Sequence, residues 1–173
     1  LWLADEEQFA RTIYLTANGW EADRTVDASL VGLWYFGLDD GDTCLFPPSD
    51  PRVVSTMETI RSRLSVEPDV IGVARYENDP YHRVSDDTDR VPGNPWFIST
   101  LWLAQWEIAT AQSIGDLHRA RERLEWAASH ALSSGVMAEQ VHPYTDEPLS
   151  VSPLTWSHAT LVSATREYVS RWR

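Results

Sequence analysis

Hydrophobic residues recur at helical spacing through much of this chain. Between residues 51 and 64 they are separated by four, three and four positions, which predicts a helix with one buried face. Asp50-Pro51 precedes this pattern, and an N-cap acid followed by proline at the first helical position is a strong start signal. A second one-sided helix is expected over residues 116–133, and Gly135 is expected to end it.

Two other segments are hydrophobic on almost all sides and predict buried helices. They cover residues 26–36 and 94–112, and the second contains several tryptophans. A last helix is expected over residues 155–172.

Residues 4–17 are also interpreted as a helix, because hydrophobic residues lie four positions apart and acids occupy the first turn. Asn18-Gly19 is expected to end this helix. Residues 37–49 are expected to form a long loop, and residues 65–93 show no convincing periodicity. An irregular stretch of that length is unusual inside a compact domain and is often functional.

Buried and one-sided helices therefore alternate, and no strand pattern competes with them. This predicts an all-α fold, and alternation of inner and outer helices is typical of a toroid of helical hairpins. A chain of 173 residues fits one domain or a piece of a larger one, so we interpret residues 1–173 as a single domain.

The charge balance narrows the possible partners. The net charge is -12, and all 14 basic residues are arginines. An acidic chain repels nucleic acids and anionic membranes, so neither is an expected partner. A lysine-free, acid-rich composition is typical of proteins from a salt-rich cytoplasm, and a GC-rich genome is the alternative explanation. We expect a cytoplasmic location, with secretion of a parent chain left open.

No cofactor or metal is expected. The single cysteine, Cys44, excludes an internal disulfide. Asp86, Asp87 and Asp89 lack the spacing and the glycine of a calcium loop and are interpreted as a solvated acidic run. His142 and His158 lack zinc-ligand spacing and are expected to form hydrogen bonds, with His158 inside the toroid.

One carboxylate stands out. Glu139 follows a short hydrophobic step and precedes a turn-rich loop that contains Pro143, Pro148 and Pro153. A loop on a rigid scaffold is a common position for a catalytic carboxylate. A solvated surface residue fits the same pattern.

Six short motifs occur in a fixed order along the chain. They are Val26-Asp27-Ala28-Ser29-Leu30, Asp50-Pro51-Arg52-Val53, Arg75-Tyr76-Glu77-Asn78-Asp79, Gly93-Asn94-Pro95-Trp96-Phe97, Ala138-Glu139-Gln140 and Trp156-Ser157-His158-Ala159. Together they resemble the C-terminal half of the catalytic domain of glycoside hydrolase family 15, the glucoamylases, in its prokaryotic branch. The resemblance runs from about residue 3 to residue 170.

The resemblance implies a barrel of six inner and six outer helices, an (α/α)6 toroid, of which this chain is the C-terminal part. It also implies release of β-D-glucose from the non-reducing ends of maltodextrin or starch, with inversion at the anomeric carbon. Glu139 matches the general base of the family. Arg75 and Tyr76 match a loop that lines the sugar pocket, and Trp96 matches an aromatic residue of its wall. An arginine fork suits sugar hydroxyls, and a tryptophan face suits a pyranose ring.

Other roles remain open for these residues. Arg75 could instead pair with Glu77 or Asp79, and Trp96 could belong to the hydrophobic core. Glu77 is kept as a candidate sugar-binding residue and as a competitor of Glu139 for the role of base.

The chain departs from the family in one respect. The general acid of the family lies upstream of the part that is matched here. Trp20-Glu21 and Trp106-Glu107 imitate its Trp-Glu pair but lie on the wrong side of the motif order. Glu21 is interpreted as a loop or helix-end acid, and Glu107 as part of a buried helix. We therefore expect a partner, the N-terminal half of the barrel, which carries the acid.

Three alternatives accompany the leading hypothesis. The substrate could be an α-1,6-glucan or trehalose, since relatives of the same fold prefer such linkages. The chain could belong to a non-catalytic carbohydrate-binding or regulatory barrel. It could also be an incomplete barrel without activity of its own, and its start at Leu1 rather than Met favours a fragment.

Overall fold

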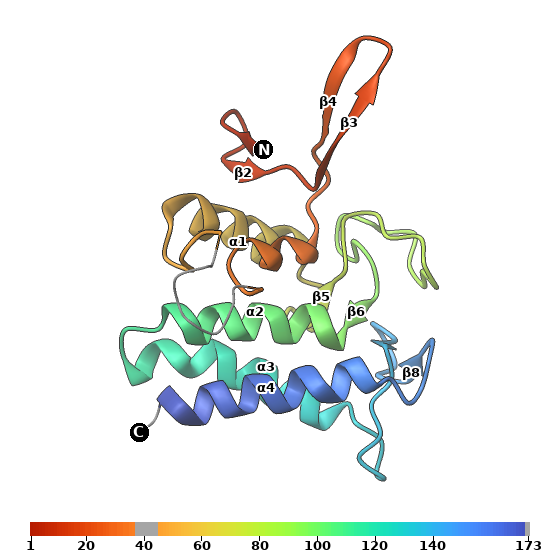
Figure 1. Cartoon of the computed structure of the whole chain (residues 1–173). Coiled ribbons are helices and arrows are strands. Elements are labelled where there is room, and N and C mark those ends of the chain that lie inside the picture. Colours follow the sequence, from red (N-terminus) through yellow and green to blue (C-terminus); the bar gives the residue numbers. More distant parts are fainter. Residues whose placement is uncertain (37–44, 172–173) are drawn as a thin grey trace.

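Stacked helices form the body of the protein, and a β-hairpin projects from it (Figure 1). The computed structural model describes residues 1–36 and 45–171. Its helices are η1 (Ala28–Leu33), α1 (Pro51–Leu64), α2 (Phe97–Thr110), η2 (Ile114–Leu117), α3 (His118–Ser129) and α4 (Thr155–Arg171), of which η1 and η2 are 3-10 helices. Its strands are β1 (Trp2–Leu3), β2 (Gln8–Phe9), β3 (Thr12–Thr16), β4 (Gly19–Asp23), β5 (Val73–Ala74), β6 (Pro95–Trp96), β7 (Gln140–Val141) and β8 (Pro148–Leu149).

Helix α2 is the centre of the fold. Every residue from Phe97 to Ile108 is buried, and α2 packs against η1, α3 and α4. The sequence explains this position, because α2 presents hydrophobic side chains in all directions. Fully burying one large hydrophobic side chain stabilises a protein by roughly 1.5–3 kcal/mol, so α2 anchors the layers around it.

Helix α1 has the bounds that its sequence pattern predicts. The Asp50 carboxylate accepts a hydrogen bond from the backbone N–H of Arg52 at 2.9 Å, and Pro51 is the first helical residue. Val53, Met57 and Ile60 are buried, so the predicted hydrophobic face does face the core. The helices predicted over residues 26–36, 94–112, 116–133 and 155–172 are also present, the first three of them shorter: residues 116–117 belong to η2, and the segment 26–36 is helical only as η1.

The helix predicted over residues 4–17 is wrong. This region forms strands β1 and β2 and the hairpin of β3 and β4, in which Ala17 and Asn18 form the turn and Gly19 begins β4. Gly19 has a φ of 114°, which glycine adopts without strain. The β-branched residues Thr12, Ile13 and Thr16 favour a strand, and this local preference together with the turn outweighs the four-residue spacing. The expectation that no strand pattern competes is therefore also wrong.

The loops at one end of α2 and α4 are joined by a small antiparallel sheet. Its strand order is β5-β6-β7-β8, with Val73 opposite Trp96, Trp96 opposite Gln140, and Gln140 opposite Leu149. An isolated bridge joins Asp27 to Tyr76 beside it. Segments far apart in the sequence thus meet at the start of α2. Cys44 and most of the predicted loop 37–49 lie outside the described residues.

Two absences concern the described parts of the chain only. None of the helices in residues 1–36 and 45–171 is long and hydrophobic enough to cross a membrane. The same residues contain no group of three or more His, Cys, Asp or Glu side chains that could hold a metal ion.

Candidate active site

A cavity of about 410 Å³ lies where the small sheet meets the N-terminal ends of η1, α2 and α4. Its walls are formed by Asp27, Ser29, Arg75, Tyr76, Trp96, Ile98, Ser99, Trp102, Glu139 and Trp156. Four of the five residues selected from the sequence are therefore in one cavity, together with two further tryptophans. Aromatic faces and charged side chains surround the same space.

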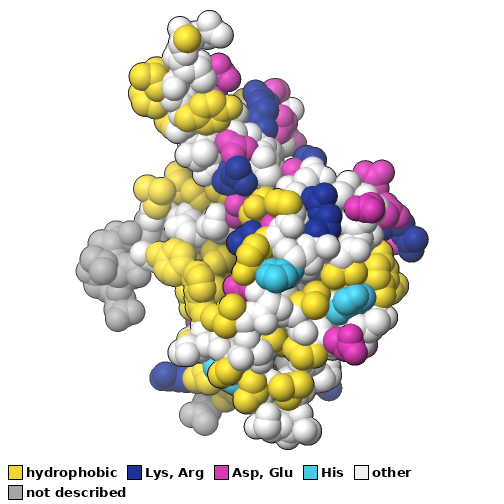
Figure 2. Space-filling view, turned by 90° about the vertical axis from the view of Figure 1, so that its right-hand side faces the viewer, with side chains coloured by type: hydrophobic (Ala, Val, Ile, Leu, Met, Phe, Trp, Pro, Cys, Tyr) yellow, Lys and Arg dark blue, Asp and Glu magenta, His cyan; other side chains and the backbone are white. Residues whose placement is uncertain are grey.

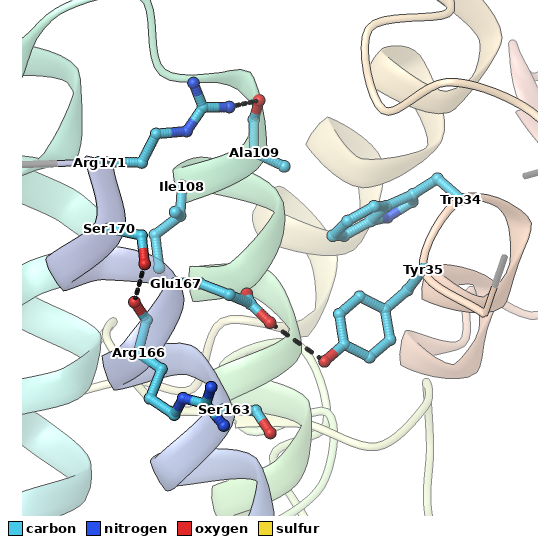
Figure 3. Close-up of a pocket in the computed structure, with 9 residues that line it drawn as sticks. All are labelled: Trp34, Tyr35, Ile108, Ala109, Ser163, Arg166, Glu167, Ser170 and Arg171. Atoms are coloured by element: carbon cyan, nitrogen blue, oxygen red, sulfur yellow. Dashed lines mark hydrogen bonds between the residues drawn. The ribbon is translucent and has the colours of Figure 1, made fainter. Parts of the chain in front are cut away.

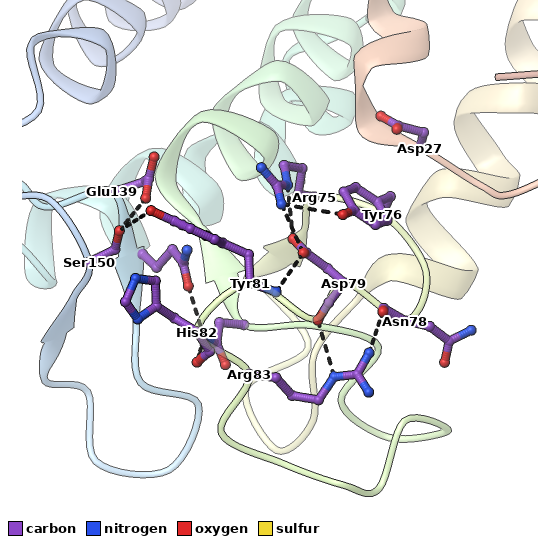
Figure 4. A network of polar contacts seen from close by, with 12 residues as sticks. Asp27, Arg75, Tyr76, Asn78, Asp79, Tyr81, His82, Arg83, Glu139 and Ser150 are labelled. Atoms are coloured by element: carbon purple, nitrogen blue, oxygen red, sulfur yellow. Dashed lines mark hydrogen bonds and ion pairs between the residues drawn. The ribbon is translucent and has the colours of Figure 1, made fainter. Parts of the chain in front are cut away.

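Glu139 is held rigidly in the wall of this cavity. Its backbone N–H donates to the carbonyl of Val151 at 2.9 Å, and its own carbonyl accepts from the N–H of Phe97 at 3.3 Å. Its carboxylate oxygen Oε2 accepts a hydrogen bond from the hydroxyl of Ser150. The Tyr81 hydroxyl lies 3.4 Å from the same Ser150 oxygen. Figure 4 shows Glu139, Ser150 and Tyr81 pointing toward one another. The segments that contain Ser150 and Tyr81 thus orient the Glu139 carboxylate, Ser150 directly and Tyr81 through Ser150.

Arg75 is fixed in the cavity by a buried carboxylate. Its Nε and Nη2 atoms donate to the two oxygens of Asp79 at 2.9 and 2.8 Å, and the Asp79 side chain is 1% exposed. Burial acts to lower the pKa of Arg75, but the hydrogen bond and charge of Asp79 outweigh it and raise the pKa above its usual value. The guanidinium is therefore permanently charged, and the predicted alternative of an ion pair with Asp79 is also correct.

Three aromatic rings surround the guanidinium of Arg75. Its Cζ atom lies 4.5 Å from the ring centre of Trp96, 4.8 Å from that of Tyr76 and 5.3 Å from that of Tyr81. Cation–π contacts of this kind hold the planar group in one orientation. Trp96 is also 6% exposed and belongs to the main hydrophobic core, so the alternative of a core role is correct, and the residue lines the cavity as well.

Glu77 is not placed with the other selected residues. Its carboxylate accepts from the backbone N–H of Val26 at 3.0 Å and forms an ion pair with Arg63. It lines a different pocket, which Glu139 does not line. These contacts give Glu77 a role in holding the loop to the segment before η1.

Glu107 and the two histidines have contacts that agree with their expected roles, whereas the interpretation of Glu21 as a loop or helix-end acid is wrong, because it lies within a strand. Glu107 is 6% exposed and paired with Arg123 Nε at 3.1 Å; burial raises its pKa, and the nearby charge of Arg123 opposes this. Glu21 lies on the projecting strand β4. His158 accepts from the N–H of Met137 at 3.1 Å, and His142 accepts from the N–H of Tyr144 at 3.2 Å.

Sequence reasoning missed several residues of the site. Ser150 contacts the candidate base and Tyr81 contacts Ser150. Neither belongs to any of the six motifs, and no sequence signal identified them. Asp27 and Trp156 line the cavity and do lie in quoted motifs, so their positions in those motifs could have selected them.

A larger cavity, of about 650 Å³, lies at the opposite ends of α2 and α4 (Figure 3). Its lining includes Trp34, Tyr35 and Glu167, whose carboxylate accepts from the Tyr35 hydroxyl at 3.3 Å and from Gln105 at 2.9 Å. Burial raises the pKa of Glu167, and these two hydrogen bonds oppose the rise. None of the residues selected from the sequence lines this cavity, so the smaller one is the candidate site.

The fold places this chain in a class, the (α/α)6 helical toroids. The sequence model of the glycosyl hydrolases family 15 matches residues 7–166 of this chain, and the chain belongs to that family. It is 30% identical over 168 residues to an uncharacterized glycosyl hydrolase of Methanocaldococcus jannaschii, a match that covers 91% of this chain and 23% of that protein. The chain thus spans about a quarter of the curated relative.

Solved structures show the same architecture. A bacterial glucoamylase complexed with acarbose has a TM-score of 0.67 at 23% identity, covering 95% of this chain and 25% of that one. The family 15 glucoamylase from Hypocrea jecorina has a TM-score of 0.70 at 20% identity, covering 98% and 35%. The fold is a partial (α/α)6 toroid, to which short strands at the connections are added.

Proposed function

We propose that this chain is the base-carrying part of an inverting, exo-acting α-glucan hydrolase that releases β-D-glucose from non-reducing ends of maltodextrin or starch. The observation that carries the proposal is the joint position of Glu139, Arg75 and Trp96 in one cavity. Membership of the family and the glucoamylases among its structural neighbours support the substrate class.

In the proposed reaction, the ionised Glu139 accepts a proton from a water molecule that attacks the anomeric carbon. An inverting glycosidase needs room for this water, so its two carboxyl groups lie roughly 6.5–9.5 Å apart. The Ser150 hydroxyl keeps the Glu139 carboxylate in the orientation that faces the water. Arg75 donates to sugar hydroxyls through its Nη1 group, for which the described residues provide no partner, while Asp79 occupies Nε and Nη2.

The general acid is proposed to come from a segment that precedes the matched motifs. The surface of helix α4 supports the proposal that a further part of the toroid packs beside it. Its hydrophobic residues Trp156, Val162 and Val169 are all about half exposed or more. Uncovered hydrophobic side chains on one helix are typical of an interface.

The location of the protein in a salt-rich cytoplasm is proposed from composition alone.

The sharpest test uses α-D-glucosyl fluoride as the substrate. Fluoride departs with little help from an acid, so the base alone is sufficient for hydrolysis. We expect this chain to release fluoride and β-glucose, and Glu139→Gln to abolish both, with the anomer followed by proton NMR. Glu147→Gln is the matched control, since Glu147 is an exposed carboxylate in the same loop. Folded protein that releases no fluoride contradicts the proposal.

Maltotetraose is the second substrate of the test. Its hydrolysis requires protonation of the leaving oxygen, so the chain by itself is expected to leave maltotetraose intact. β-Glucose release from maltotetraose that depends on Glu139 would place an acid within this chain. Circular dichroism confirms in each case that the helices have formed.

A further inference from the structure

The β3–β4 hairpin has two chemically different faces. Residues directly opposite each other in an antiparallel pair share a face. Leu15 is opposite Trp20 and Ile13 is opposite Ala22, so these four hydrophobic side chains form one face. Tyr14 is opposite Glu21 on the other face, where the Thr16 hydroxyl donates to Glu21 at 2.7 Å. We call the first set, Ile13, Leu15, Trp20 and Ala22, the hairpin platform.

The hairpin platform is open to solvent. The side chains of Leu15 and Trp20 are 68% and 71% exposed. Figure 2 shows hydrophobic side chains along the projecting hairpin and, below it, down the same edge of the molecule. A tryptophan and a leucine side by side on an exposed strand pair cost free energy in water unless something covers them.

The stem of the hairpin is tied to the candidate active site. Arg11, which precedes β3, donates to Asp23 at the end of β4 through Nε at 2.8 Å. Its Nη1 lies 3.7 Å from Asp27, and its Cζ lies 5.2 Å from the ring centre of Tyr76. Asp27 and Tyr76 both line the cavity that contains Glu139. The hairpin therefore rises directly from the rim of this cavity.

The distance from the rim to the platform fits an oligosaccharide. Trp20 lies three residues along β4 from Asp23, which is about 10 Å of extended strand. A few linked glucose units span such a distance. Tryptophan rings stack on the apolar faces of pyranose rings, and a neutral chain avoids repulsion from a protein with a net charge of -12.

A second copy of the chain is a poorer occupant. A stable protein interface buries about 800 Å² on each partner, and four side chains on a two-stranded hairpin provide far less.

We propose that the hairpin platform binds glucosyl units of an α-glucan that extend beyond the cavity, so that it gives the site a preference for longer chains. This inference rests on the proposed function, because the end of the same glucan must occupy the cavity. The platform adds binding at a distance from the reacting bond.

Binding to this chain tests the platform without requiring catalysis. Isothermal titration calorimetry with maltose and with maltoheptaose gives the two dissociation constants. We expect Trp20→Ala to weaken maltoheptaose binding about tenfold and to leave maltose binding unchanged. Leu15→Thr, which preserves strand propensity, is expected to act in the same direction, and the matched control Tyr14→Ala on the opposite face to change neither constant.

The outcomes separate this inference from the proposed function. If maltose does not bind, the proposed function fails at the cavity. If maltose binds but the ratio of the two constants is the same in Trp20→Ala and the unaltered chain, the platform inference alone fails. Sedimentation velocity provides the remaining outcome: self-association that Trp20→Ala abolishes would assign the platform to a second copy and overturn the inference.

Discussion

The Ser150 hydroxyl donates a hydrogen bond to the Glu139 carboxylate, and the Tyr81 hydroxyl lies 3.4 Å from the Ser150 hydroxyl. Ser150 belongs to the segment next to β8, and its φ of 64° turns its side chain toward β7 and Glu139. The pairing of β7 with β8 therefore decides the position of the candidate base. A carboxylate that must face one water molecule gains from such a fixed orientation.

Ser150→Ala is expected to lower the rate of α-D-glucosyl fluoride hydrolysis roughly three- to tenfold. The variant loses one hydrogen bond to a charged group, so the Glu139 carboxylate spends less time in the productive orientation. A fluoride electrode measures the initial rate. Ser152→Ala, an exposed serine two residues away, is the control and should keep the full rate. An unchanged rate in Ser150→Ala would exclude an orienting role.

Asp79→Asn tests the second fixed element, the Arg75–Asp79 pair. The variant keeps the size of the side chain and removes its charge, which leaves two donor groups facing each other. We expect the free energy of unfolding to fall by roughly 1–3 kcal/mol and maltose binding to weaken about tenfold. Urea denaturation followed by circular dichroism measures the first effect, and calorimetry the second.

The control for Asp79→Asn is Asp86→Asn, an exposed acid in the same irregular stretch. It should change neither quantity. Loss of stability with full maltose affinity would show that Asp79 only supports the fold and does not position Arg75 for sugar.

The helices of this chain could be predicted because the sequence of each segment contains its own helix signals. The N-cap and proline at Asp50-Pro51 define the start of α1, and continuous hydrophobicity identifies α2 as the central helix. The N-terminal region could not be predicted in the same way. Its spacing fits a helix as well as a strand, and the choice depends on the turn that Ala17 and Asn18 form before Gly19 and on pairing between β3 and β4.

The candidate site likewise contains residues that the sequence could predict and residues that it could not. Glu139, Arg75, Tyr76 and Trp96 were found through motifs that resemble a known family. Ser150 could not be found, because its contact with Glu139 arises from strands of only two residues that carry no periodic signal. Glu77 adjoins Tyr76 in sequence, but in the structure it turns away to Val26 and Arg63.

Asp50 gives a prediction about pH. The hydrogen bond from the Arg52 side chain and then that from the Arg52 backbone N–H lower the pKa of Asp50 to about 2. Because the pKa is lower in the folded state, the stabilisation is complete above the ordinary pKa of 3.8 and is lost as the pH falls toward 2. The difference in melting temperature between the unaltered chain and Asp50→Asn should therefore narrow from pH 6 to pH 3.

Asp50→Ala separates the charge of Asp50 from its role as helix cap. Alanine removes the acceptor at every pH, so the melting temperature should fall by about 2–4 °C even in acid. A difference between Asp50→Asn and the unaltered chain that is constant with pH would show that the ion pair with Arg52 contributes nothing to stability.

Salt should stabilise this protein. The net charge of -12 opposes the compact state through self-repulsion, and counterions screen it. Ion pairs with both side chains exposed, such as Arg24 with Asp5 and Arg90 with Glu67, contribute little to stability, so screening of these pairs costs less than the relief of self-repulsion gains. We expect the melting temperature to rise by roughly 5 °C between 0.1 and 2 M KCl, which corresponds to about 1–2 kcal/mol in the free energy of unfolding.

Differential scanning calorimetry measures this melting temperature, with sucrose as the uncharged control solute. A lower melting temperature in KCl would contradict the proposed adaptation to high salt and favour the explanation of the arginine content by genome composition.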